Sequence, residues 1–209
     1  MGMKKYLNII YIFYFFSLLK KLYFIMYNRV LLRLYGASVG KNLKIFNSIL
    51  ITIKPSGKLI IGQNCSIQSV SFFNPLIRGL YASIYVGSNA TLILSDNVGI
   101  SSAAIWCANN ISIGANTKVG AGCIIMDNDA HNLDYKLRYN SCDDISISKP
   151  IKIESDVLIG ANSIILKGVT IGTRTIIGAG SVVTKDIPSD CIAAGNPCRI
   201  LKKINNDKI

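Results

Sequence analysis

Aliphatic residues recur at every sixth position along much of the chain after residue 36. The longest run, in which each member lies six positions after the one before, is Ile153, Ile159, Ile165, Ile171, Ile177 and Val183. Shorter runs with the same spacing lie within residues 86–99 and 113–125. An amphipathic helix would repeat apolar residues every three or four positions and a simple strand every two, so neither pattern fits by itself. Because six is a multiple of two, the spacing predicts short strands with one inward aliphatic residue in every six.

Tight turns are expected between these strands. Glycine often follows the aliphatic residue directly and supplies backbone freedom near a corner. The asparagines that come soon after, which tolerate turn conformations, are Asn64, Asn89, Asn116 and Asn162. Such strands and corners fit three to a coil in a triangular solenoid, whose stacked coils bury a continuous aliphatic column. We therefore predict an all-β solenoid over residues 37–203, followed by a short tail at residues 204–209.

The first 36 residues have a different pattern. Tyr6 to Leu19 is an apolar run of 14 residues between two Lys-Lys pairs, which is short of the roughly 20 residues that span a bilayer. No small-residue cleavage site of a signal peptide follows it. We expect a hydrophobic helical segment over residues 1–36. It either packs on its own domain or a neighbouring subunit, or lies at a membrane surface as a monotopic anchor.

The six-residue period is interrupted in the second half of the chain. Gly120 and Gly160 are 40 residues apart, which is not a multiple of six. A segment between about residues 126 and 148 must therefore leave the solenoid as an extruded loop. It contains the only histidine, His131, and gathers the acidic residues Asp127, Asp129, Asp134, Asp143 and Asp144. Functional residues concentrate on loops that a rigid scaffold positions.

Composition and charge narrow the classes of partner. Half of the 209 residues are hydrophobic and the mean hydropathy is +0.40, which excludes intrinsic disorder as the main state. The net charge is +12, and eleven basic residues but no acidic residue precede Asp96. Such an excess points to a nucleic acid, a membrane surface or an anionic small molecule. The N-terminal basic residues alternate with apolar ones and accompany no nucleic-acid-binding motif, so a membrane surface is favoured and a nucleic acid is not.

The cysteines and the single histidine leave little scope for a metal site. Six cysteines form no Cys-x-x-Cys pair and no tight cluster. Zinc sites need several thiolate or imidazole ligands close together. We therefore expect reduced, mostly packed thiols and no metal cofactor.

The last quarter of the chain contains the segments GAGSVVTKDIP and AAGNPCR. With these and the six-residue period, the chain resembles the hexapeptide-repeat acyltransferases from about Val39 to Lys203. Its ending is most similar to that of sugar and polysaccharide O-acetyltransferases of the galactoside and maltose acetyltransferase type. The resemblance implies a left-handed parallel β-helix, an exception to the right-handed crossover rule. It also implies a homotrimer that uses acetyl-CoA. One departure is Val157-Leu158, where the family usually has Trp.

The resemblance also implies a general base. A sugar hydroxyl that attacks a thioester must lose its proton, and histidine, with an ordinary pKa of roughly 6.5, suits that task. Asp127, Asp129 and His131 align with the family's catalytic histidine segment. We expect His131 to be the base, and Asp127 and Asp129 to orient its ring, to bind acceptor hydroxyls, or to form a polar turn. An acyl-cysteine route through Cys123 or Cys142 lacks a matching motif, so direct transfer is favoured.

By the same resemblance, CoA would bind between adjacent β-helices of a trimer. The positions that match its binding residues in the family are Ala161, Ala179, Thr184, Lys185, Arg199 and Lys202. The cations among them would pair with phosphate oxygens. The acceptor candidates, chosen by position, are Trp106, Asn109, Asn110 and Arg138. Trp106 would stack on a sugar face, although an aromatic residue in a solenoid is more often part of the core.

The sequence therefore predicts an acetyl-CoA-dependent O-acetyltransferase that acts on a sugar hydroxyl of a bacterial surface polysaccharide or its precursor. We expect it in the cytoplasm or peripherally at the inner face of the membrane. An amino-sugar N-acetyltransferase, a serine acetyltransferase and a catalytically silent structural β-helix remain alternatives. The serine enzymes carry a longer helical N-terminal domain than 36 residues allow. A γ carbonic anhydrase is disfavoured because its zinc site needs three histidines.

Overall fold

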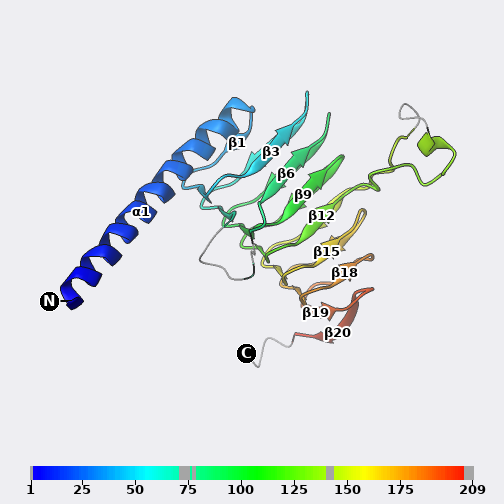
Figure 1. Cartoon of the computed structure of the whole chain (residues 1–209). Coiled ribbons are helices and arrows are strands. Elements are labelled where there is room, and N and C mark those ends of the chain that lie inside the picture. Colours follow the sequence, from blue (N-terminus) through cyan, green and yellow to red (C-terminus); the bar gives the residue numbers. More distant parts are fainter. Residues whose placement is uncertain (1, 71–75, 77–78, 140–143, 205–209) are drawn as a thin grey trace.

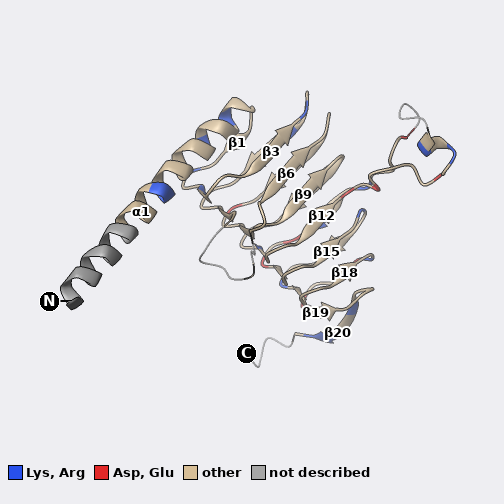
Figure 2. Cartoon of the chain, viewed as in Figure 1, with Lys and Arg blue, Asp and Glu red and all other residues tan. Residues whose placement is uncertain are grey.

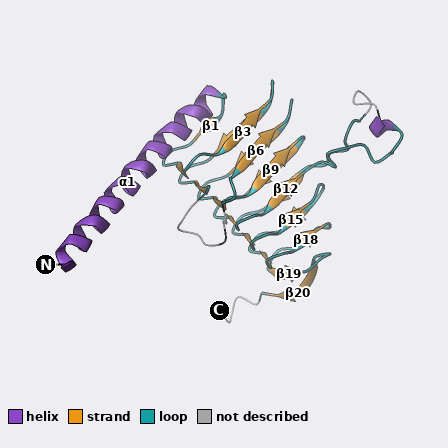
Figure 3. Ribbon diagram, viewed as in Figure 1, coloured by secondary structure: helices purple, strands orange, loops and turns teal. Residues whose placement is uncertain are grey.

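The computed structural model describes residues 2–70, 76, 79–139 and 144–204, with the side chains of the first helix described from residue 15 onward (Figure 1). The tail residues 205–209 lie outside this range. One long helix, α1 (Gly2–Leu34), precedes a stack of short strands (Figure 3).

The strands form three sheets, and the chain visits the three sheets in turn. The first sheet contains β1 (Ser38–Val39), β4 (Lys58–Ile61), β7 (Thr91–Leu94), β10 (Asn110–Ile113), β13 (Ile151–Ile153) and β16 (Thr170–Ile171). The second contains β2 (Lys44–Phe46), β5 (Ser66–Gln68), β8 (Gly99–Ser101), β11 (Lys118–Val119), β14 (Leu158–Ile159), β17 (Ile176–Ile177), β19 (Cys191–Ala194) and β20 (Arg199–Lys203). The third contains β3 (Leu50–Ile53), β6 (Ser83–Val86), β9 (Ala104–Cys107), β12 (Ile124–Met126), β15 (Ile164–Ile165) and β18 (Val182–Val183).

Parallel pairing relates each strand to the strand one coil away. From β1 to β18 every paired strand meets the strand three places along the chain, as β12 meets β9 and β15. The spacing changes at the C-terminal end, where β17 pairs parallel with β19, two places along, and β20 pairs antiparallel with β19. Three parallel sheets with one N-terminal helix fit the predicted parallel β-helix.

The predicted aliphatic column forms the core. All six members of the longest run, Ile153, Ile159, Ile165, Ile171, Ile177 and Val183, are buried. Register stacks the members that are 18 residues apart, as Ile159 lies beside Ile177, and on its other side Ile159 lies beside Val119 of an earlier run. Burying each such side chain contributes about 1.5–3 kcal/mol, so the repeated position carries much of the stability. The prediction of one inward aliphatic residue in every six is confirmed here.

The corners use residues in the left-handed region of φ. The four asparagines predicted to lie in turns all have φ between 55° and 61°: Asn64, Asn89, Asn116 and Asn162. Side chains at one corner also bond from coil to coil. Asn116 Nδ2 donates to Asp156 Oδ1 at 2.8 Å, and Asn97 Nδ2 donates to Asn116 Oδ1 at 2.9 Å. These amides therefore form the turn and link neighbouring coils.

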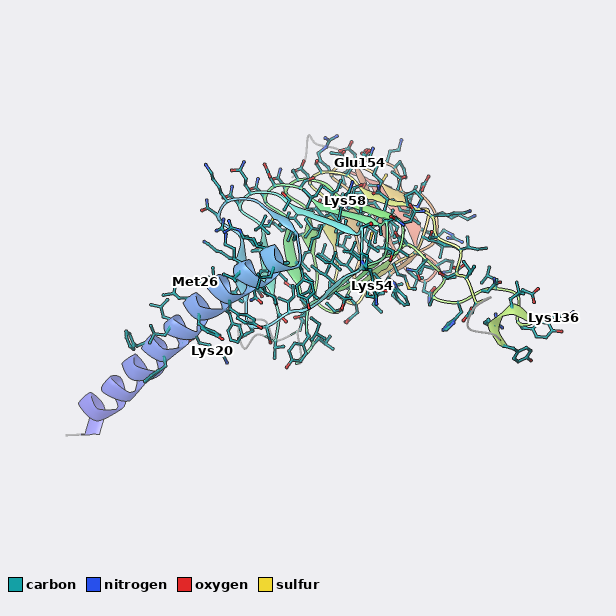
Figure 4. All side chains as sticks on the ribbon, turned by 90° about the horizontal axis from the view of Figure 1, so that it is seen from above. Lys20, Met26, Lys54, Lys58, Lys136 and Glu154 are labelled. Atoms are coloured by element: carbon teal, nitrogen blue, oxygen red, sulfur yellow. The ribbon has the colours of Figure 1, made fainter. Side chains whose placement is uncertain are left out.

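The described contacts of helix α1 with the strands lie near its C-terminal end. Leu32 is buried there, and the buried Asn28 donates from Nδ2 to the Asn47 carbonyl at 2.8 Å. Arg29 Nη2 donates to the Gly40 carbonyl at 3.3 Å. The rest of the helix projects away from the stack, and its described side chains include exposed aromatic and aliphatic residues such as Met26 (Figure 4). Within the described residues, no helix has both the length and the apolar character that crossing a bilayer requires.

The connection between β12 and β13, here called the His131 segment (residues 127–150), carries one short 3-10 helix, η1 (Leu137–Tyr139). Residues 140–143 lie outside the described part of it. Its described side chains from Leu133 to Tyr139 are exposed, and η1 with Lys136 lies apart from the strands on the side opposite α1 (Figure 4). Its two ends meet again in an antiparallel bridge between Asn128 and Ser148.

Candidate active site

His131 lies on the His131 segment with 69% of its side chain exposed. Its Nδ1 is 2.5 Å from Oδ2 of Asp144, whose side chain is 15% exposed. The other Asp144 oxygen accepts the Asn132 backbone N–H at 2.6 Å. That amide, and then the bond from His131, hold the pKa of Asp144 below its ordinary value. An ionised carboxylate can only accept hydrogen bonds, so neutral His131 carries its hydrogen on Nδ1 and leaves Nε2 to accept a proton.

Asp127 makes a different set of contacts. Its buried carboxylate accepts the backbone N–H of Ala108 at 2.6 Å and that of Asn109 at 2.8 Å. Burial, and then the charge of Asp127, raise the pKa of the neighbouring Cys107 thiol to about 12. Both carboxylate oxygens thus hold the corner before β10, which corresponds to the polar-turn alternative. No hydrogen bond joins Asp127 to His131 in the described part of the chain.

Asp129 forms an ion pair with Lys167, and each side chain is 20% exposed. Its backbone carbonyl accepts the His131 N–H at 2.7 Å. Among Asp127, Asp129 and Asp144, the carboxylate that contacts the His131 ring is that of Asp144, which the sequence pattern did not single out. The gathering of acidic residues in this segment was the only available signal, since the fold of the loop decides which one meets the ring.

The acceptor candidates lie around the base of the His131 segment and within it. Trp106 is on the outer face of β9, 40% exposed, with its ring edge-on to Tyr85 at 5.9 Å between centroids. It is thus a surface residue and not part of the core. Asn109 Nδ2 donates to Ser148 Oγ at 3.2 Å, and exposed Asn110 begins β10. Arg138 Nη1 donates to the carbonyls of Asn132 and Leu133 at 2.8 and 3.0 Å.

The six CoA candidates lie at two corners and on the last strand. Ala161 and Ala179 are at the corner between the second and third sheets, where Gly180 donates its N–H to the Ala161 carbonyl at 2.8 Å. Exposed Thr184 and Lys185 follow β18. The His131 segment leaves the stack at the equivalent corner after β12, two coils earlier. Exposed Arg199 and Lys202 are on β20. A single copy of the chain therefore does not gather these positions around His131.

The cysteines are packed, as expected, in the described part of the chain. Cys65, Cys107, Cys123, Cys191 and Cys198 are all buried and free, whereas Cys142 lies outside the described residues. Burial raises the pKa of the Cys123 thiol, which contacts the Gly160 carbonyl at 3.2 Å. A buried thiol with a raised pKa is a poor nucleophile. Among the side chains that are described, no group of three or more His, Cys, Asp or Glu is placed to hold a metal ion.

Known proteins resemble this chain in sequence. Residues 150–185 match a family model described as the hexapeptide repeat of succinyl-transferase. The galactoside O-acetyltransferase of Lactococcus lactis subsp. lactis (strain IL1403) is 34% identical over 146 residues, which are 70% of this chain and 63% of that protein. The chain thus spans less than two thirds of that relative's length.

Solved structures resemble it in fold. One is a hexapeptide-repeat-containing acetyltransferase from Vibrio cholerae O1 biovar eltor, complexed with acetyl-coenzyme A. It is 25% identical with a TM-score of 0.53, and the match covers 84% of this chain and 74% of the Vibrio cholerae chain. The polySia-specific acetyltransferase NeuO is 26% identical with a TM-score of 0.55, over 83% and 79% of the two chains. The predicted resemblance is therefore confirmed, since in repeat, sequence and fold the chain is similar to the hexapeptide-repeat acetyltransferases.

Proposed function

We propose that this chain is an acetyl-CoA-dependent O-acetyltransferase that acts on a sugar hydroxyl of a bacterial surface polysaccharide or its precursor. The observation that carries the proposal is the pairing of the lone histidine with Asp144, on a segment that leaves the repeat stack. The similarity to a galactoside O-acetyltransferase, to a polySia-specific acetyltransferase and to an acetyltransferase complexed with acetyl-coenzyme A supports it.

In this proposal His131 Nε2 removes the proton from the acceptor hydroxyl as its oxygen attacks the thioester carbonyl. The tetrahedral intermediate then collapses, the carbon–sulfur bond breaks, and the imidazolium returns the proton to the CoA sulfur. Asp144 accepts the Nδ1–H bond throughout and stabilises the imidazolium. General base catalysis of this kind contributes roughly 10²–10⁴-fold to the rate. The burial of Cys123 supports direct transfer over an acyl-cysteine intermediate.

The proposal includes a homotrimer of left-handed β-helices with the site between copies. The outer face of the third sheet supports this, because exposed Leu50, Trp106 and Ile124 lie on it and a neighbouring copy would bury them. A second copy would also bring the corner of Ala161 and Ala179 to the His131 segment of the first. Lys185, Arg199 and Lys202 would then pair with the phosphates of CoA. Asp129 remains in this proposal as a residue of the catalytic segment, and Asp127 as its support.

We further propose that α1 holds the enzyme peripherally at the inner face of the cytoplasmic membrane. Phe16, Met26 and Leu34 are more than half exposed on the described part of the helix. Basic residues mark the described part of α1 and the first coils (Figure 2), and no acidic residue precedes Asp96. Exposed apolar side chains together with cations suit an anionic lipid surface, where a lipid-linked acceptor would lie.

Thiol-release kinetics with acetyl-CoA test the proposed function. The acceptors are galactosides, polysialic acid oligomers and amino sugars, and the wild type is compared with His131→Ala. We expect the variant to lose about 10²–10⁴-fold in kcat, with little change in the KM for acetyl-CoA. The matched control is Lys136→Ala, because exposed Lys136 lies in the same segment and its side-chain contact among the described residues is with the Tyr135 ring. Unchanged turnover in His131→Ala contradicts the assignment of the base, and failure of the wild type to bind CoA contradicts the whole proposal.

A further inference from the structure

Backbone hydrogen bonds join the two ends of the His131 segment to each other. Near its start, the Asp129 N–H donates to the Ile147 carbonyl at 3.2 Å, and near its end the Lys149 N–H donates to the Asp127 carbonyl at 2.8 Å. These bonds close the neck of the segment on itself. They do not determine where the closed neck points relative to the coils.

An ion pair provides that link. The Asp129 carboxylate meets the ammonium of Lys167, which follows β15 in the coil next to β12. The exit of the segment reaches the same corner, because the Gly168 N–H donates to the Lys149 carbonyl at 3.2 Å. Entry and exit of the segment are thus both attached to residues 167–168, which connect two strands of the stack.

The contact continues from Asp129 to the proposed base. The Asp129 carbonyl accepts the His131 N–H at 2.7 Å, so the residue that pairs with Lys167 also positions the backbone of His131. On the other side, Asp127 binds the amides of residues 108 and 109 in the preceding coil. The start of the segment is therefore held between two coils, by backbone amides on one side and a charge on the other.

The burial of the pair makes it more than an ordinary surface contact. Each side chain is only 20% exposed, whereas Lys152, which pairs with Glu154, is 63% exposed. Removing one partner of a largely buried pair leaves an uncompensated charge, so the remaining residue must move toward water. Displacing Asp129 in this way would displace the His131 backbone bonded to it.

We propose that Lys167 and Asp129 form a positioning pair that sets the location of His131 over the stack. This inference rests on the proposed function for its effect on rate, but not for its effect on the segment. Misplacing a catalytic group by about 1 Å can cost on the order of 100-fold in rate. Lys167 acts in this scheme through Asp129 and does not touch the reacting atoms.

The test compares Lys167→Met, Lys167→Arg and Asp129→Asn with the wild type by two readouts. The first is the kcat of thiol release, for which we expect a loss of about 10–100-fold in Lys167→Met and a KM for acetyl-CoA within about twofold of the wild type. The second is amide hydrogen exchange over residues 127–139, which should become at least about tenfold faster. Since His131 is the only histidine, its ring signal in histidine-labelled protein reports the same displacement by NMR.

Charge restoration separates positioning from a general loss of stability. Lys167→Arg, and the exchanged pair Asp129→Lys with Lys167→Asp, should each recover kcat to within about tenfold of the wild type. The double variant Asp129→Asn with Lys167→Met should lose no more than either single variant, because the two residues act as one unit. The matched control is Lys152→Met, which breaks an exposed pair on the first sheet and should leave both readouts unchanged.

An unchanged rate of amide hydrogen exchange over residues 127–139 in Lys167→Met overturns the inference, whatever happens to kcat. Faster exchange with unchanged kcat in an active enzyme overturns it as well, since His131 would then not depend on the pair. Should the wild type release no thiol with any acceptor, the proposed function fails, and the exchange and NMR readouts alone decide whether the pair positions the segment.

Discussion

The contact between Asp144 and His131 determines what the histidine can do. The carboxylate accepts from Nδ1 and also from the Asn132 amide, and its pKa is held below the ordinary range. It therefore stays ionised across the neutral and mildly acidic range. An ionised partner fixes both the plane of the imidazole and the tautomer in which Nε2 is free.

Asp144→Asn tests this role. An amide can offer its NH2 group to Nδ1 and favour the other tautomer, so we expect kcat to fall by about 10²–10⁴-fold with the KM for acetyl-CoA nearly unchanged. Because the pKa of Asp144 is lowered, the wild-type carboxylate is ionised at both pH 6 and pH 8, so the loss of kcat should be present at both pH values. Asp134→Asn is the matched control, since Asp134 lies in the same segment and its Oδ1 accepts the Lys136 N–H, which an amide oxygen can also do. A kcat of Asp144→Asn within threefold of the wild-type kcat contradicts the role assigned to Asp144.

The sequence pointed to the segment around His131 and to its acidic character, but not to which carboxylate contacts which partner. Asp129 and Asp127 lie only two and four residues before His131, yet their side chains reach neighbouring coils. Asp144 is 13 residues away and becomes adjacent only when the segment folds back. Spacing alone carries no information about such a contact, because the loop has no repeat to fix its register.

At the scale of elements, the corners limit which residues the repeat accepts. Gly160 follows β14 where two coils approach closely, and a Cβ added there would lie 2.4 Å from the Ala179 nitrogen. Neighbouring coils are fixed by parallel pairing on both sides, so the backbone cannot move away at one corner alone. Glycine is needed at this position for close approach, since its φ is not in the left-handed region.

Gly160→Ala should therefore destabilise the fold. We expect a loss of about 1–3 kcal/mol in the free energy of unfolding from the steric conflict, measured by urea denaturation at fixed protein concentration. Gly87→Ala is the matched control, because a Cβ there would lie no closer than 3.3 Å to its nearest neighbour and Gly87 also avoids the left-handed region. Equal losses in the two variants would contradict the close-approach argument.

The elements were predictable to the extent that they repeat. The six-residue period identified the buried position of the strands within its runs, and the asparagines identified corners that the structure has in the left-handed region. The antiparallel β20 lies outside the period, so no repeat indicated its direction. The docking of α1 through Asn28 was equally hidden, because a single polar residue in an apolar helix does not reveal its partner.

At the scale of the whole molecule, the two hypotheses for the N-terminal segment both describe part of it. The last turns of α1 pack on the first coil through Asn28, Arg29 and Leu32. The preceding described turns keep their apolar side chains exposed, as Phe15, Phe16 and Tyr23 are. The observed packing and the proposed lipid contact thus concern different stretches of one helix, and a truncation can separate them.

Deleting residues 1–24 should remove membrane binding and leave the fold intact. Asn28, Arg29 and Leu32 remain in this variant, so its thermal midpoint should stay within a few degrees of the wild type and CoA binding should persist. Cosedimentation with vesicles that contain phosphatidylglycerol should be lost. The control is deletion of residues 1–36, which also removes the packing residues and should lower the thermal midpoint. Persistent vesicle binding by the shorter deletion would contradict the anchoring proposal.

The two ends of the stack have a consequence for self-association. A β-solenoid whose terminal coils were bare would offer unpaired N–H and C=O groups to the next molecule, and could grow end to end into a filament. Here α1 lies against β1 and β2 at one end, while β20 reverses direction and covers β19 at the other. An antiparallel strand cannot extend a parallel coil. α1 and β20 therefore occupy part of the strand edges through which copies would stack, and both oppose end-to-end growth along the axis.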